Sequence, residues 1–177
     1  MKPHVLVILL LALSGTVNAD VEKIAQPSES GMRLMWWPKV DPPSGWHFDK
    51  NASYHYATKA FAPDGSTFSD ATTVMYAKAE YKPRVSDVNN LKALIDEDIS
   101  EFSDATARHE KPLLSRDGKQ FQVVEFSPKA NGNWERVAYG EEPDYYILFS
   151  VSSRNKEGLV RALPAFRSLV ASYKNGP

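Results

Sequence analysis

Two histidines and one aspartate near the start of the chain could bind a metal ion or move a proton. His47 and Asp49 are two residues apart, which places both on one face of an extended strand, and His55 follows shortly after. Zinc usually needs three or four converging ligands, and the compact motif His-Glu-x-x-His is not in the sequence. Histidines that hydrogen-bond at the surface would account for the same pattern. We keep these three residues as candidate ligands, while the sequence predicts neither a metal nor a cofactor.

A serine nucleophile has one candidate position. The run Ser153-Arg154-Asn155-Lys156 fits the spacing Ser-x-x-Lys of penicillin-recognising enzymes. The partner motifs Ser-Asp-Asn and Lys-Thr-Gly are not in the sequence, and neither is the nucleophile elbow Gly-x-Ser-x-Gly. We therefore interpret this run as a strand end followed by a helix cap, and we expect a non-enzymatic protein.

Acidic residues gather between positions 96 and 101, where Asp96, Glu97, Asp98 and Glu101 could form carboxylate pairs. They fall on the polar side of an amphipathic helix, where water screens charges and pKa values stay ordinary. The sequence predicts a solvated helix face here.

Adjacent tryptophans at positions 36 and 37 could contact a partner. In an extended segment their side chains point to opposite faces, so one could fill the core while the other is exposed. Two buried rings are the competing interpretation. Trp36 and Trp37 are the candidate partner-binding residues.

The elements that must position these residues follow from apolar periodicity and turn chemistry. We predict strands at residues 46–49, 54–61, 71–81, 120–126, 134–139 and 144–153, the last as the central strand. Asp117-Gly118 favours a type I′ hairpin turn. One helix follows a cap at Ser86, and a closing helix follows Asn155. Strands interrupted by two helices indicate an α+β fold in which helices cover an antiparallel sheet.

The first nineteen residues are typical of a cleavable signal peptide. Lys2 precedes a run of apolar residues at positions 5–13 that is too short to span a bilayer, and Val17-Asn18-Ala19 suits signal peptidase. We expect cleavage between Ala19 and Asp20, then a flexible leader at residues 20–31 and a single α+β domain at residues 32–177. The product would be exported, to the periplasm or the exterior.

Charge and composition narrow the partner classes. The full chain carries a formal charge of −1 and has no cysteine. Removal of Lys2 with the signal peptide would make the charge −2, which gives no electrostatic reason to bind nucleic acid or an anionic membrane. A chain without cysteine has neither disulfides nor a lipoprotein anchor. We expect a protein partner and no membrane insertion after cleavage.

Several runs together resemble the PsbP and Mog1-like group. They are Trp46-His47-Phe48-Asp49, Phe61-Ala62-Pro63-Asp64-Gly65, Thr73-Val74-Met75-Tyr76, and the ending from Tyr146 through Phe166 to Tyr173. The resemblance spans roughly residues 45–174. It implies an α/β/α sandwich whose members act by binding larger protein assemblies, but it identifies no partner for this chain.

These observations favour an exported, non-enzymatic binding or accessory protein of the cell envelope, for which an immunity factor is one concrete form. The alternative is a small periplasmic hydrolase or ligand-binding protein with a site near His47, Asp49 and His55. The two classes differ in the surface they require. An enzyme needs a pocket where these side chains converge, whereas a binding module needs an exposed patch.

Overall fold

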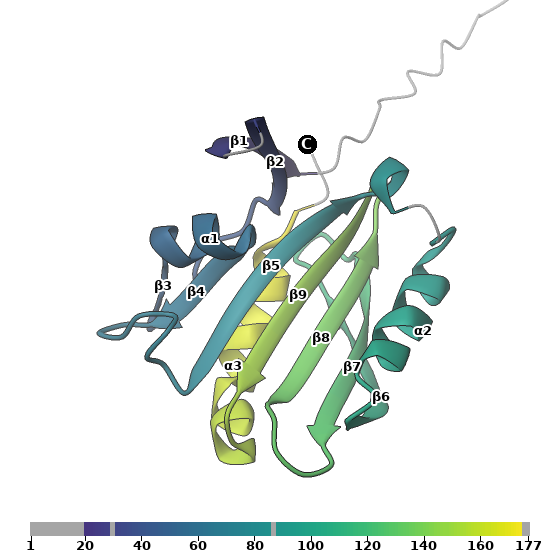
Figure 1. The fold of residues 1–177 in the computed structure, drawn as a ribbon. Coiled ribbons are helices and arrows are strands. Elements are labelled where there is room, and N and C mark those ends of the chain that lie inside the picture. Colours follow the sequence, from purple (N-terminus) through teal and green to yellow (C-terminus); the bar gives the residue numbers. More distant parts are fainter. Residues whose placement is uncertain (1–19, 29–30, 86–87, 175–177) are drawn as a thin grey trace, which may run out of the picture.

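Alternating apolar side chains build a seven-stranded antiparallel sheet with the order β3-β4-β5-β9-β8-β7-β6 (Figure 1). The computed structural model describes residues 20–28, 31–85 and 88–174, so the predicted signal peptide and the predicted cap Ser86 lie outside the described residues. The strands are β3 (Trp46–Phe48), β4 (Lys59–Pro63), β5 (Thr73–Tyr81), β6 (Ala105–Leu114), β7 (Gln120–Pro128), β8 (Trp134–Glu141) and β9 (Tyr145–Ser153).

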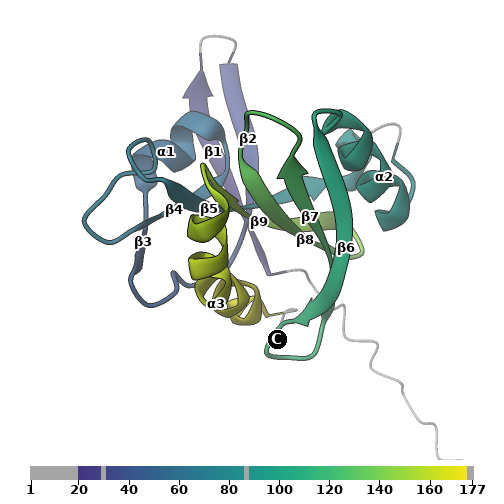
Figure 2. The same ribbon diagram turned by 90° about the horizontal axis from the view of Figure 1, so that it is seen from below.

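Helices cover both faces of this sheet. Helix α3 (Lys156–Ser172) packs on one face, α2 (Leu91–Glu101) packs on the other, and the short α1 (Lys50–Tyr56) lies beside β4. Figure 2 shows α3 and α2 on opposite sides of the sheet. The expected α+β class with a helix-covered antiparallel sheet is confirmed.

Each face of the sheet has its own apolar core. The larger core joins α3 to β5, β7 and β9 and includes the fully buried rings of Phe121, Phe149, Phe166 and Tyr173. The smaller core joins α2 to β7, β8 and β9, and Ile95 is its most deeply buried helical residue. Strand β9 contributes to both cores, as expected for the central strand, and it is the fourth of the seven.

The predicted strand at residues 54–61 is wrong in its first half. Residues Lys50–Tyr56 form α1, because the Asp49 side chain accepts a hydrogen bond from the Ala52 amide at 3.0 Å and so caps the helix. The Ser53 hydroxyl then accepts a bond from the Ala60 amide at 2.8 Å, which fixes α1 against β4. Ala57 ends the helix in the left-handed conformation, with φ of 57°.

The predicted turn at Asp117-Gly118 also differs from the observed one. The connection between β6 and β7 is not a type I′ turn, because only Gly118 has a positive φ there, of 90°. A wider loop forms instead, in which the Ser115 hydroxyl accepts from the Lys119 amide at 2.9 Å.

The helix caps were also predicted from the sequence, that of α2 at Ser86. Helix α2 is capped by Asn90, whose side chain accepts from the Ala93 amide at 2.9 Å. The predicted cap of α3, Asn155, is confirmed by its 2.8 Å bond from the Gly158 amide.

A separate hairpin precedes the sheet. Its strands are β1 (Val21–Ser28) and β2 (Gly31–Pro38), so the segment expected as a flexible leader contains a paired strand. Ion pairs hold its base, with Lys39 2.8 Å from Asp20 and Lys59 3.2 Å from Glu22. The polar composition of residues 20–31 concealed this strand, because its pairing depends on the apolar partner strand β2.

The outer strand β6 forms one edge of the sheet and pairs only with β7. Its register shifts between Glu110 and Leu113, and Pro112 lies within the shifted stretch. Within the described residues, no helix has the length and apolar character needed to cross a membrane.

Candidate binding site

The two adjacent tryptophans on β2 point to opposite faces of the hairpin, as an extended segment requires. Trp37 is 3% exposed and meets the rings of Phe48 and Tyr54 edge-on, at centroid distances of 6.0 and 5.5 Å. Trp36 is only half-buried. Trp37 therefore anchors the hairpin against α1, and Trp36 is the ring that reaches the surface.

Trp36 lies beside Tyr81, the last residue of β5, and Arg84, the last residue of the short 3-10 helix that follows (Lys82–Arg84). Its ring stacks on Tyr81 at 5.5 Å with an interplanar angle of 23°, and the Arg84 guanidinium carbon lies 4.7 Å from its centroid. Such stacking restricts the arginine side chain while leaving its planar N–H donors free. The arrangement presents an oriented guanidinium at the surface.

A groove of about 300 Å³ runs along these residues between the hairpin and β5. We call it the Trp36 groove, and its lining consists of Arg33, Leu34, Met35, Trp36, Ala57, Lys78, Ala79, Glu80, Tyr81, Arg84 and Val85. The exposed side chain of Met32, at 61%, lies near its hairpin wall on the same strand.

The charge of the Trp36 groove is positive. Glu80 is its acidic residue, and it is already paired with Lys78 at 2.6 Å. Within the described part of the chain, Arg33 and Arg84 have no carboxylate within ion-pairing distance. These two guanidinium groups, of which Arg84 lies over the Trp36 ring, are suited to bind a carboxylate.

The structure does not bring the candidate ligands His47, Asp49 and His55 together as one three-ligand cluster. The Nδ1 atom of His47, on β3, lies 3.6 Å from a carboxylate oxygen of Asp64, which follows β4, and both side chains are exposed. His55 is exposed near the end of α1, with its ring edge-on to Tyr56 at 4.6 Å. Only Asp49 and His55 line a common hollow, of about 510 Å³. No cluster of three or more potential metal ligands occurs among the described residues.

Asp49 is committed to the backbone. One carboxylate oxygen accepts from the Ala52 amide and the other accepts from the Phe68 amide at 2.9 Å. These backbone hydrogen bonds hold the pKa of Asp49 below its usual value of 3.8. A carboxylate in this state is a poor base, and its evident role is to join α1 to the loop that contains Phe68.

Sequence patterns did not reveal a pair of acid–phenol contacts on the α2 face. The Tyr139 hydroxyl donates to Asp98 at 2.9 Å, and the Tyr76 hydroxyl donates to Glu135. Burial raises the pKa values of Asp98 and Glu135, and also those of the two phenols. Asp98 is therefore not part of a fully solvated helix face. In the sequence, Tyr76 lies between the apolar residues Met75 and Ala77 of β5, which was the available indication that its hydroxyl lies on the opposite face of the strand.

Comparison with known proteins finds distant structural matches only. No protein-family model matches the chain, and a search of the curated proteins finds no match. Among solved structures, the Ran-binding protein Mog1p of Saccharomyces cerevisiae matches with a TM-score of 0.43 and 12% identity, covering 88% of this chain and 96% of that one.

The solution structure of cyanobacterial PsbP (CyanoP) from Synechocystis sp. PCC 6803 also matches. Its TM-score is 0.43 and its identity is 11%, with 94% of this chain and 98% of that chain covered. These are the two groups that the sequence resembles. The likeness is one of overall fold and identifies no shared site, so the functional proposals rest on this chain's own surfaces.

Proposed function

We propose that this chain is a non-enzymatic, exported protein of the cell envelope that binds an acidic, extended segment of another protein in the Trp36 groove. The observation that carries the proposal is that Arg33 and Arg84 line the Trp36 groove together with the half-buried Trp36, and neither pairs with a carboxylate of the described residues. The chain as a whole is slightly acidic, so this local positive charge is not a reflection of its composition.

The positive charge of the Trp36 groove favours a partner segment with acidic side chains. A carboxylate entering the Trp36 groove meets Arg84, whose donors the Trp36 ring already orients, so less side-chain entropy is lost on binding. Leu34 from the hairpin, which is half-buried, supplies an apolar contact beside the charges. A segment that alternates acidic and apolar side chains would satisfy both.

The hairpin strengthens this assignment because it is fixed in place. Trp37 packs against α1, and Lys59 ties Glu22 of β1 to β4. One wall of the Trp36 groove is therefore anchored to the sheet before any partner arrives. A preorganised wall lowers the free-energy cost of binding.

Photocrosslinking in the producing cells tests the proposal. A photoreactive residue at Met32, beside the Trp36 groove, is expected to form a specific adduct with an envelope protein. The same residue at the exposed position Lys92 on α2 is expected to form none. The double variant Arg33→Glu/Arg84→Glu should reduce the Met32 adduct about tenfold or more, because it reverses the charge of the groove.

The matched control is Arg167→Glu, which reverses an exposed charge on α3 and should leave the adduct unchanged. The adduct should also weaken as salt is raised, since the contact is partly exposed and electrostatic. An adduct that persists in the double variant, or an equal adduct from position 92, would contradict the proposal. Circular dichroism of each variant verifies that the fold is retained.

A further inference from the structure

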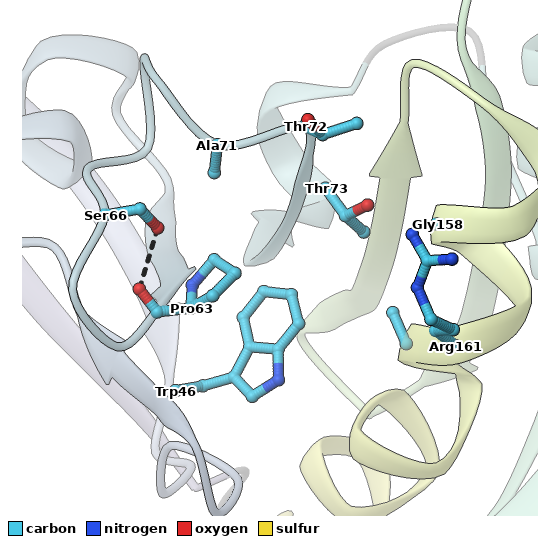
Figure 3. Close-up of a pocket in the computed structure, with 9 residues that line it drawn as sticks. Trp46, Pro63, Ser66, Ala71, Thr72, Thr73, Gly158 and Arg161 are labelled. Carbon is cyan, nitrogen blue, oxygen red and sulfur yellow. Dashed lines mark hydrogen bonds between the residues drawn. The ribbon is translucent and has the colours of Figure 1, made fainter.

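A second hollow, of about 360 Å³, lies between the β3–β4 end of the sheet and the first turns of α3 (Figure 3). Its lining consists of Trp46, Pro63, Ser66, Ala71, Thr72, Thr73, Gly158, Arg161 and Ala162. It shares no lining residue with the Trp36 groove. Its volume is at the lower end of the range for small-molecule sites.

Hydrogen-bond donors without partners face this hollow. Figure 3 shows the Arg161 guanidinium near Thr73 on one side and the Trp46 indole ring across from them. Among the described residues, neither the Arg161 guanidinium nor the Trp46 indole N–H has a hydrogen-bond or ion-pair partner. The Thr73 hydroxyl is held in place by the Ser153 hydroxyl at 2.8 Å.

Charge and shape together define the ligand class. The lining includes one cation, Arg161, and no carboxylate, so the hollow favours an anion. The Trp46 ring and the Pro63 ring supply flat apolar walls on the side opposite the guanidinium (Figure 3). These features suit a molecule with a charged end and a flat apolar body.

The wall formed by α3 is rigid because the helix approaches the sheet closely at Gly158. A Cβ atom there would lie 2.4 Å from the Ser153 hydroxyl oxygen and 2.6 Å from that of Thr73. Only glycine allows this approach, so the first turn of α3 is held against the ends of β5 and β9. The backbone of Arg161, three positions further along α3, is therefore held near the sheet, while its side chain is exposed.

We propose that this hollow binds a small aromatic carboxylate. Its carboxylate accepts hydrogen bonds from Arg161, and its ring packs against Trp46 and Pro63. Arginine pairs with a carboxylate through two parallel N–H donors, which gives both strength and orientation. This binding activity is independent of the partner surface at the Trp36 groove.

Nuclear magnetic resonance of the purified protein provides the test. The four tryptophans give separate indole N–H signals, and the variant Trp46→Phe assigns the signal of Trp46. Phenylacetate, indole-3-acetate and benzoate are titrated, with phenylacetamide as the uncharged probe. We expect at least one anion to shift the Trp46 signal in a saturable way while the Trp36 signal stays in place.

Variants of α3 isolate the role of the charge. Arg161→Gln should weaken binding of the anion about tenfold or more, since it removes a charged hydrogen-bond donor. Arg161→Lys should keep part of the affinity, and Arg167→Gln, an exposed control on the same helix, should keep all of it. The proposal is overturned if no anion shifts the Trp46 signal, if Arg161→Gln binds as well as the parent protein, or if phenylacetamide binds as well as phenylacetate.

Discussion

The two faces of the sheet are packed by different chemistry. On the α3 face, the rings of Phe121 and Phe149 meet Tyr173 edge-on, and the fully buried Phe166 belongs to the same core. On the α2 face, the apolar contacts of Ile95 are accompanied by the carboxyl–phenol pairs that join Asp98 to Tyr139 and Glu135 to Tyr76. The α3 face also has such a contact, from Tyr173 to Glu142 at 3.1 Å. The comparison teaches that the larger aromatic core lies on the α3 face, whereas the carboxyl groups whose pKa values burial raises, Asp98 and Glu135, lie on the α2 face.

The largest expected effect is the loss of an aromatic ring from the α3 face. Phe166→Ala should lower the free energy of unfolding by about 3–5 kcal/mol, because Phe166 is 0% exposed and its removal leaves a cavity. Urea unfolding followed by circular dichroism measures the change. A loss below about 1 kcal/mol would show that α3 contributes far less than its burial indicates.

An intermediate effect is expected from Glu135 on the opposite face, where burial raises the carboxyl pKa. A raised pKa in the folded state means that the stabilisation is complete below the usual value of 4.5 and is lost as pH rises through the folded value. The parent protein should therefore lose stability relative to Glu135→Gln as pH increases above 4.5. Unfolding free energies of both proteins between acid and neutral pH measure the difference.

The matched control for this pH profile is Glu97→Gln, which changes an exposed carboxylate on α2. Its stability should follow the parent profile. If the unfolding free energies of the parent protein and Glu135→Gln changed with pH in the same way, Glu135 would not contribute to the pH dependence of stability.

The smallest effect on stability is expected for a substitution on the solvent-exposed side of α2. Lys92 pairs with Asp96 at 2.5 Å, but both side chains are more than half exposed. Lys92→Ala should therefore change the free energy of unfolding by no more than about 0.5 kcal/mol, as for other exposed pairs one helical turn apart. A thermal melt that moved by several degrees would reveal a role that the exposed geometry does not provide.

Elements with strong local periodicity were predictable from sequence. Strand β9 has aromatic and aliphatic residues on both faces, and α3 follows its Asn155 cap with a clear apolar stripe. Helix α1 was not predictable in this way, because its cap residue Asp49 also bonds to Phe68, which is nineteen positions away. Residues 20–31 were interpreted as a leader for a similar reason, because their strand is formed by pairing with β2.

The candidate sites depend even more on distant contacts. The adjacent pair Trp36 and Trp37 indicated the strand that forms one wall of the Trp36 groove, but the groove also includes Tyr81 and Arg84 from another part of the chain. Asp98 was interpreted as solvated because its contact with Tyr139 crosses from α2 to β8. Burial of this kind arises from tertiary packing and has no signature in local residue spacing.

The interrupted edge of β6 limits how molecules of this protein can stack. An unprotected outer strand offers its free amides and carbonyls to a neighbouring chain, which is a route to fibrous aggregates. Pro112 offers no amide proton, and the register shift between Glu110 and Leu113 bends the strand away from a flat template. The opposite edge, β3, has only three residues. Both edge strands of the seven-stranded sheet are therefore short or irregular, which disfavours pairing of this sheet with that of a neighbouring molecule.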